Sequence, residues 1–238
     1  MKSYPIKADL DLYVDPYAAI PTEIIKQNPW HWDPLETDHN DGGHWLYQDT
    51  SVSWFDLAEW AIAKSNEVRV PQKYWWWDDE TNQAMHADES VNHCPIFDTC
   101  KQWMVQNDYN EHNTRYFKFA NEELEEFYEP LRLMFAHKLE DMTMSLFVQP
   151  PGQIMPDHVD TFSSYMRKTG DYPDYSCLRR YMTFVSDWDW GHFFHYGNHV
   201  MQPWRQGDTW DLAPGIYHGS ANSGVTPKIT MHWSGKLK

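Results

Sequence analysis

The chain has 238 residues, of which 41% are hydrophobic and 23% charged, as expected of a globular protein with a sizeable core. Its 19 Lys and Arg against 35 Asp and Glu give a formal net charge of −16, which argues against non-specific binding to nucleic acid or anionic membranes. The sequence has no run of about 18 apolar residues that could span a bilayer. The acidic first residues also lack the pattern of a secretory or transit signal, so we expect a cytoplasmic protein.

Two helices are expected in the first half of the chain. Residues 53–64 place apolar side chains on one side, and residues 121–140 repeat them at helical spacing behind Asn121 as a possible N-cap. Pro130 should start or kink the second helix. In residues 70–118 the apolar residues show no clear helical or strand periodicity. We therefore expect residues 1–141 to form a helical and irregular region.

From Met142 onward, short segments rich in β-branched and aromatic residues alternate with Pro, Gly, Asn and Asp turns. The expected strands lie in residues 142–149, 177–186, 192–198, 207–214 and 228–234. Because few helix-length segments separate them, a parallel α/β sheet is disfavoured. We predict a mainly β fold with flanking helices, a double-stranded β-helix (jelly roll, cupin-like) over residues 142–238, integrated with the preceding region into one domain.

The sharpest chemical signal is His158-Val159-Asp160 followed by His218. In an extended segment, residues i and i+2 point to the same face, so His158 and Asp160 can offer a nitrogen and an oxygen to one cation. His218, from a distant strand, would add the third ligand. Two imidazoles and one carboxylate on one face of a metal are typical of non-haem Fe(II) oxygenases, which keep the other positions open.

The surroundings of this motif resemble the 2-oxoglutarate and Fe(II)-dependent dioxygenases, in particular the prolyl 4-hydroxylase and aspartyl/asparaginyl β-hydroxylase-like branches. The resemblance covers roughly residues 142–236. FVQPPGQIMPDHVDTF is similar to the family's strand, turn and first two ligands, and WRQGDTWDLAPGIYHGSANSGVTPKITMHWSG is similar to its later half. It implies Fe(II) bound by His158, Asp160 and His218 as the catalytic residues, with 2-oxoglutarate and dioxygen as cosubstrates and ascorbate as reductant.

The resemblance also implies a cosubstrate site. Lys228, ten positions after His218, would neutralise the C5 carboxylate of 2-oxoglutarate, because an unpaired buried carboxylate is costly. Thr230 lies two residues further along the same strand and could add a hydroxyl donor. Arg179 would contact the cosubstrate, and Tyr181 would point to the same face of the strand as Arg179. Because side chains alternate along a strand, only one of Arg179 and Arg180 can point inward.

The chain departs from the family pattern in two places. Many family members have a tyrosine on the first barrel strand that binds the C5 carboxylate, whereas the matching stretch here reads Leu146-Phe147-Val148. That hydrogen bond must be absent or replaced. Lys228 also stands where the asparaginyl hydroxylase branch has Arg, so the sub-family is left open.

Several other residues could take part in binding. Trp188, Tyr165 and Arg180 are candidates for substrate contacts at the barrel mouth, although tryptophans such as those at 75–77 and 188–190 are more often core residues. His192, His195 and His199 could suggest a zinc site, but the surrounding aromatic and glycine residues favour a strand and turn. His232 is expected in the core or close to the site.

These features predict a 2-oxoglutarate-dependent dioxygenase that hydroxylates a C–H bond and releases succinate and CO₂. Its substrate would be a peptide or a small molecule, and its oligomeric state is open. Two alternatives remain. One is a non-catalytic jelly-roll binding module, and the other is a cupin-type metalloenzyme that does not use 2-oxoglutarate and would not need Lys228.

Overall fold

The structure is a computed structural model, and it describes the part of the chain that follows the first fifty-one residues, with gaps. The described residues are 52–73, 115–158, 160, 162, 165, 166, 169–171, 173–197, 199–212, 214, 216 and 218–238. For residues 72, 73, 156–158 and 175 it describes the backbone alone. Trp75, Trp76 and Trp77, as well as Cys94 and Cys100, lie outside the described residues.

The first expected helix is confirmed as α2 (Trp54–Val68), which runs four residues further than residue 64. Ser53 is its N-cap, and its side chain accepts a hydrogen bond from the backbone N–H of Asp56 at 3.3 Å. Arg69 ends the helix in the left-handed conformation. The buried face of α2, with Leu57, packs on the six-stranded sheet described below.

The second expected helix is split and shorter than predicted. A 3-10 segment, η3 (Asn121–Phe127), leads into α4 (Tyr128–Phe135), which has Pro130 in its first turn, where a missing N–H costs nothing. The expected cap at Asn121 is wrong. Ala120 occupies the N-cap position, and Asn121 Oδ1 instead accepts a hydrogen bond from the backbone N–H of Met144 at 3.0 Å.

The described strands form two antiparallel sheets. The six-stranded sheet has the order β1-β2-β3-β10-β5-β8, with bounds Gln72–Lys73, Arg115–Ala120, Leu139–Gln149, Lys228–Leu237, Leu178–Phe184 and Thr209–Leu212. The four-stranded sheet has the order β4-β9-β6-β7, with bounds Gln153–His158, His218–Asn222, His192–Tyr196 and His199–Val200. A short 3-10 turn, η4 (Tyr175–Cys177), precedes β5, and Cys177 is exposed with a free thiol.

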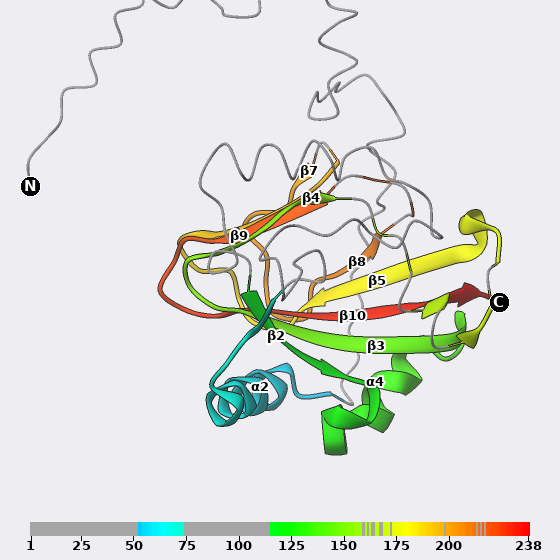
Figure 1. Cartoon of the computed structure of the whole chain (residues 1–238), viewed down its shortest axis with the longest axis horizontal. Coiled ribbons are helices and arrows are strands. Elements are labelled where there is room, and N and C mark those ends of the chain that lie inside the picture. The colour runs from blue at the N-terminus through cyan, green and yellow to red at the C-terminus, as the bar shows by residue number, and fades with distance from the viewer. Residues whose placement is uncertain are drawn as a thin grey trace, which may run out of the picture. The chain divides into compact units, whose positions relative to one another are not determined.

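From β3 to β10 the chain passes back and forth between the two sheets. β3, β5, β8 and β10 belong to the larger sheet, and β4, β6, β7 and β9 belong to the smaller one. Figure 1 shows α2 and α4 on one side of the β3–β10 layer, with β4 and β9 on the other side. The predicted fold class is confirmed: a double-stranded β-helix, or jelly roll, that is mainly β with flanking helices.

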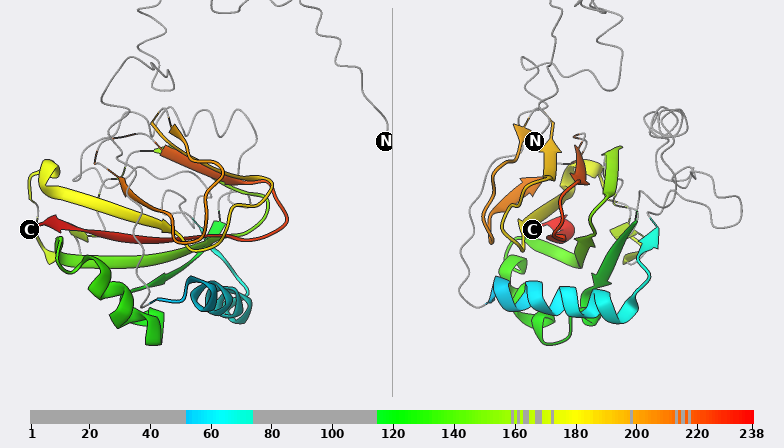
Figure 2. Two further views of the ribbon diagram at one scale, coloured as in Figure 1. Left: turned by 180° about the vertical axis from the view of Figure 1, so that it is seen from behind. Right: turned by 90° about the vertical axis from the view of Figure 1, so that its left-hand side faces the viewer.

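Each face of the larger sheet has its own core. Its outer face packs with α2 and α4 through residues such as Leu146, Met231 and Trp233. Its inner face packs against the smaller sheet, where Met182 and Phe184 contact aromatic residues of β6. Figure 2 shows the two layers from behind and from the side. This arrangement makes strand alternation decisive, because one residue faces a helix and the next faces the interior.

Buried polar groups join the two sheets at one end. Ser220 Oγ on β9 donates to Gln149 Oε1 on β3 at 2.9 Å, and Asn222 Nδ2 donates to the Gln149 carbonyl at 2.9 Å. Nearby, Gly191 in the β5–β6 loop has φ +92°, and a Cβ there would lie 2.3 Å from the backbone nitrogen of Gly224. Only glycine permits this close crossing of the two loops.

Among the described residues, no helix combines the length and apolar character needed to cross a membrane.

Candidate metal and anion site

Alternation along β5 decides which arginine faces the interior. Met182 belongs to the core between the sheets, so Arg180, two residues earlier, shares its inner face. The Arg180 guanidinium donates from Nη1 to Asp160 Oδ1 at 2.5 Å and from Nε to Ser234 Oγ at 3.0 Å. It also lies 5.3 Å from the ring centroid of Phe162. These contacts fix the guanidinium at one end of the barrel interior.

Arg179 and Tyr181 lie on the opposite face, so the expectation that they contact the cosubstrate is corrected. The ring of Tyr181 stacks on Phe135 of α4, with centroids 4.3 Å apart. Arg179 Nε is 3.5 Å from Asp211 Oδ1. The physical reason is the register of β5, which turns its odd-numbered residues toward the helices.

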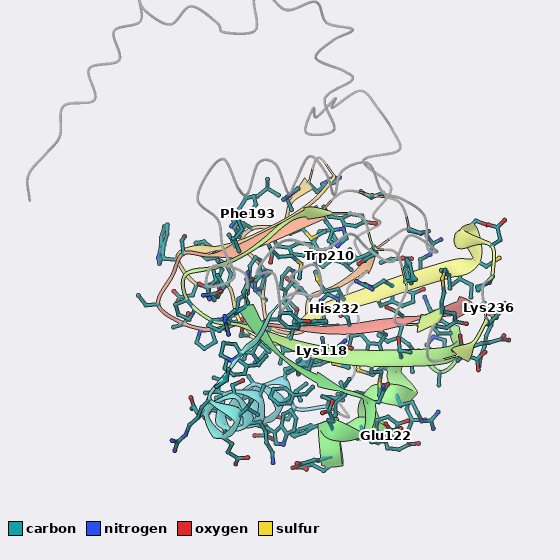
Figure 3. The ribbon with its side chains drawn as sticks, viewed as in Figure 1. Lys118, Glu122, Phe193, Trp210, His232 and Lys236 are labelled. Atoms are coloured by element: carbon teal, nitrogen blue, oxygen red, sulfur yellow. The ribbon has the colours of Figure 1, made fainter. Side chains whose placement is uncertain are left out.

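The inner face of β10 is unusually polar. Lys228, Thr230, His232 and Ser234 alternate with Ile229, Met231 and Trp233, which pack in the helix-side core. Because β10 lies between β3 and β5, its even-numbered side chains line the middle of the interior. Figure 3 shows His232 on the side of β10 that faces the smaller sheet. A central strand with four polar residues on its buried face is therefore a candidate ligand-binding surface.

His218 begins β9 and lies deep in the interior. Its Nδ1 is 3.0 Å from the carbonyl of Ile216, so this nitrogen donates and the lone pair of the neutral ring is on Nε2. Burial lowers the pKa of His218 and favours the neutral imidazole that a metal requires. In the β4–β9 register, the backbone of His158 is directly opposite that of His218.

The Asp160 carboxylate brings its two oxygens to different partners. Oδ1 accepts from Arg180, and Oδ2 lies 3.6 Å from His218 Nε2. This second separation is too long for a hydrogen bond. Metal–ligand bonds of about 2.1 Å place two ligands of one ion roughly 3.0 to 3.4 Å apart. The Asp160 and His218 atoms therefore fit a shared cation after a shift of a few tenths of an ångström.

Among the side chains that the structure describes, which do not include that of His158, no three His, Cys, Asp or Glu residues converge as a metal site. The fit to a cation thus rests on Asp160 and His218. In metal sites, ligands are commonly oriented by hydrogen bonds to residues that do not touch the metal. The bonds of His218 Nδ1 to the Ile216 carbonyl and of Arg180 to Asp160 Oδ1 are of this kind.

Lys228 is a buried cation at the other end of the interior. Its side chain is 3% exposed, and its ammonium donates to the carbonyl of Phe193 at 3.3 Å and lies 5.3 Å from the ring centroid of Phe194. Burial lowers its pKa to about 7. Among the described residues, no carboxylate forms an ion pair with Lys228. A buried ammonium without a counter-ion favours an anionic ligand.

His218 and Lys228 both lie near the ring of Phe194, on the inner face of β6. The ring centroid of Phe194 lies 6.3 Å from that of His218 and 5.3 Å from the Lys228 ammonium. The inner surface thus offers Asp160 and His218 at one end and Lys228 with Thr230 at the other.

Tyr165 and Trp188 have different relations to this surface. Tyr165 packs in a small cluster with Phe162, whose ring contacts Arg180, and so lies near the Asp160 end. Trp188 follows the far end of β5, and its indole Nε1 donates to the carbonyl of His192 at 2.9 Å. The structure therefore does not bring Trp188 to the Asp160 end.

The histidine-rich run forms a strand, as predicted. His192 is on β6, where its Nε2 is 2.9 Å from the carbonyl of Thr226 and burial lowers its pKa. His195 is one of the buried residues of β6, with Nδ1 3.4 Å from the Gly197 carbonyl, whereas His199 on β7 is exposed. The hydrogen bonds of His192 are consistent with a structural role, whereas burial lowers the pKa of His218 and His195 lies close enough to His218 to lower it further.

Sequence reasoning missed one residue on the inner surface, Ser234, whose hydroxyl accepts a hydrogen bond from Arg180. The signal that could have found it is its even spacing from Lys228 and Thr230 along one strand. His232, which was expected in the core or close to the site, lies on the same face.

No protein-family model matches the chain, and no curated protein sequence matches it. Solved structures with low overall similarity are found. A double-stranded β-helix protein from Klebsiella pneumoniae is 23% identical, covering 42% of this chain and 70% of that one, with a TM-score of 0.29. A cupin domain from Bordetella pertussis is 11% identical, covering 42% and 83%, with a TM-score of 0.28. A putative sugar phosphate isomerase from Acidithiobacillus ferrooxidans is 12% identical, covering 42% and 51%, with a TM-score of 0.28.

Proposed function

We propose that this protein is a 2-oxoglutarate-dependent non-haem Fe(II) dioxygenase that hydroxylates a C–H bond. One observation carries the proposal: the oxygen and nitrogen of Asp160 and His218, at cation-sharing distance, face the same interior as a buried Lys228 without a carboxylate partner among the described residues. A metal-binding 2-oxo acid with a distal carboxylate would use both features.

Fe(II) would be held by His218 Nε2, Asp160 Oδ2 and His158, whose backbone lies opposite His218. Three such ligands leave positions for a 2-oxo acid and dioxygen. Once bound, Fe(II) supplies the redox chemistry that couples oxidative decarboxylation of 2-oxoglutarate, to succinate and CO₂, with hydroxylation of a substrate C–H bond.

The protein's own residues would bind the cosubstrate and orient the metal ligands. Arg180 holds Oδ1 of Asp160, so the carboxylate presents Oδ2 toward His218. The Ile216 carbonyl fixes the tautomer of His218. Lys228 would bind the distal carboxylate, and the buried side chains of Phe194 and Met182 would keep water away from the ligand. Exclusion of water strengthens each of these charge interactions.

The alternatives make different demands on Lys228. A cupin-type metalloenzyme that does not use 2-oxoglutarate needs the metal ligands but no buried ammonium, and a non-catalytic binding module needs neither. The protein should therefore be titrated anaerobically with Fe(II) and then with 2-oxoglutarate. The proposal expects a visible metal-to-ligand charge-transfer band, which requires both components on one site. Stoichiometric Fe(II) binding without this band would favour the cupin-type alternative, and no Fe(II) binding would favour the binding module.

A further inference from the structure

Thr230 lies between Lys228 and His232 on the inner face of β10. It is 7% exposed, and its hydroxyl oxygen is 3.1 Å from His232 Nε2. The other ring nitrogen of His232, Nδ1, is buried and has no hydrogen-bond partner among the described residues. The imidazole therefore makes one polar contact within the described structure, and that contact is with the threonine.

The surroundings of His232 favour one assignment of donor and acceptor. Burial lowers the pKa of His232 well below its ordinary value, and the titratable groups that act on it are Arg180, Asp160, His218 and Lys228. A neutral imidazole has a single N–H. Buried N–H groups without an acceptor are rarer in proteins than buried acceptors without a donor. We therefore assign the proton to Nε2, which then donates to Thr230 Oγ1, and the lone pair to Nδ1.

With its oxygen accepting from His232, Thr230 must direct its own O–H elsewhere. The described residues offer this proton no second partner. Lys228, two positions away on the same face, has an ammonium whose one described hydrogen bond is to Phe193. The same face of β10 therefore carries an O–H donor and an N–H donor two positions apart, the two kinds of donor that the oxygens of a carboxylate accept from.

Phe147 lies on β3, the strand on which many family members have a tyrosine that supplies a second hydroxyl. It pairs with Thr230 across the β3–β10 ladder, and its ring packs 4.9 Å from that of His232. β3 therefore contributes an aromatic ring at this position and no donor, and Phe147 holds the imidazole against Thr230.

We infer that His232 is a positioning residue that turns the Thr230 hydroxyl into a donor for the distal carboxylate of the 2-oxo acid, and so sets a preference for a dicarboxylate over a monocarboxylate. This inference rests on the proposed function. It assigns His232 no contact with the ligand itself.

A double-mutant cycle tests this inference. The dissociation constant of 2-oxoglutarate is measured by anaerobic calorimetry in the Mn(II)-loaded protein for wild type, Thr230→Val, His232→Leu and the double variant. Loss of one hydrogen bond to a charged group should weaken binding roughly tenfold or more in either single variant. The double variant should be no weaker than Thr230→Val, because His232 acts through Thr230. Multiplying effects in the double variant would overturn the inference.

Two further variants and a second ligand make the result specific. His232→Gln retains an N–H near the position of Nε2 and should recover most of the affinity, whereas Met231→Leu, on the outer face, should leave it unchanged. Pyruvate lacks the distal carboxylate, so its affinity should be the same with and without His232. Equal loss of pyruvate and 2-oxoglutarate binding would contradict the inference. Failure of wild type to bind 2-oxoglutarate would instead contradict the proposed function.

Discussion

Asp160 Oδ2 lies 3.6 Å from His218 Nε2, where Asp160 follows the end of β4 by two residues and His218 begins β9. The separation is too long for a hydrogen bond and close to that of two ligands on one ion. Replacing Asp160 with Ala should therefore abolish stoichiometric Mn(II) or Fe(II) binding, measured by calorimetry or metal analysis, while the circular dichroism spectrum stays native. His158→Ala should do the same. Asp211→Asn, on the outer face, is the matched control, and unchanged metal content in both site variants would refute the metal site.

Arg180 should stabilise the metal-free protein. Its ion pair with Asp160 is largely buried, and removing one partner of such a pair costs about 3 kcal/mol, less to the extent that water screens the pair. Arg180→Gln should lower the melting temperature of the metal-free protein, and Mn(II) should raise it by more in this variant than in wild type, because the cation then neutralises Asp160. Arg179→Gln makes the same change of charge on the opposite face. A similar response in both variants would mean that the ion pair has no special relation to the metal.

Lys228→Met should weaken 2-oxoglutarate binding by roughly 100-fold or more, because the distal carboxylate would lose its charged partner. Metal binding should persist, which separates this effect from a general loss of structure. Calorimetry on the Mn(II)-loaded variant measures both. An unchanged dissociation constant would remove Lys228 from the site.

The pKa of about 7 at Lys228 predicts opposite pH effects on binding and on stability. The ammonium must be protonated to bind a carboxylate, so the wild-type dissociation constant should rise by up to about tenfold per pH unit above pH 7. In the unfolded chain the lysine keeps its ordinary pKa of 10.5, so the folding cost of its buried charge is complete below pH 7 and disappears as pH rises toward 10.5. Lys228→Met should therefore raise the free energy of unfolding by several kcal/mol at pH 6 and by much less at pH 10, measured by urea denaturation. Parallel pH profiles for the two proteins would contradict this assignment.

Turnover without substrate separates an enzyme from a binding module. Purified protein with Fe(II), ascorbate and oxygen should slowly convert 2-oxoglutarate to succinate, and the rate should collapse in Asp160→Ala, because the ion is no longer held and oriented. Oxidation of the protein itself, seen as a mass gain of about one oxygen, should map near the Asp160 end, where Tyr165 lies. Absence of both succinate and oxidised peptides from iron-loaded protein would favour the binding-module alternative.

The fold class could be predicted because local signals in the sequence agree with it. Short alternating strands punctuated by turn residues specify an antiparallel jelly roll, and Ser53 marks the start of α2 correctly. Strand β2 begins in a stretch where apolar residues show no clear periodicity, and its pairing with β1 and β3 fixes its place in the sheet. The split between η3 and α4 and the hydrogen bond of Asn121 to Met144 likewise depend on contacts with residues far along the chain.

The sequence by itself determined the chemistry available to the site: a histidine and a carboxylate at i and i+2, a distal histidine, and a lysine with a threonine two positions later. The spacing of two is informative because residues i and i+2 of a strand point to the same face of the sheet. Only the tertiary structure decided that Arg180 rather than Arg179 faces Asp160, since adjacent arginines are equivalent until a sheet gains one helix-covered face. It also decided that Lys228 is buried without a described carboxylate partner and that His232 bonds Thr230, because burial and hydrogen-bond partners depend on which strands become neighbours.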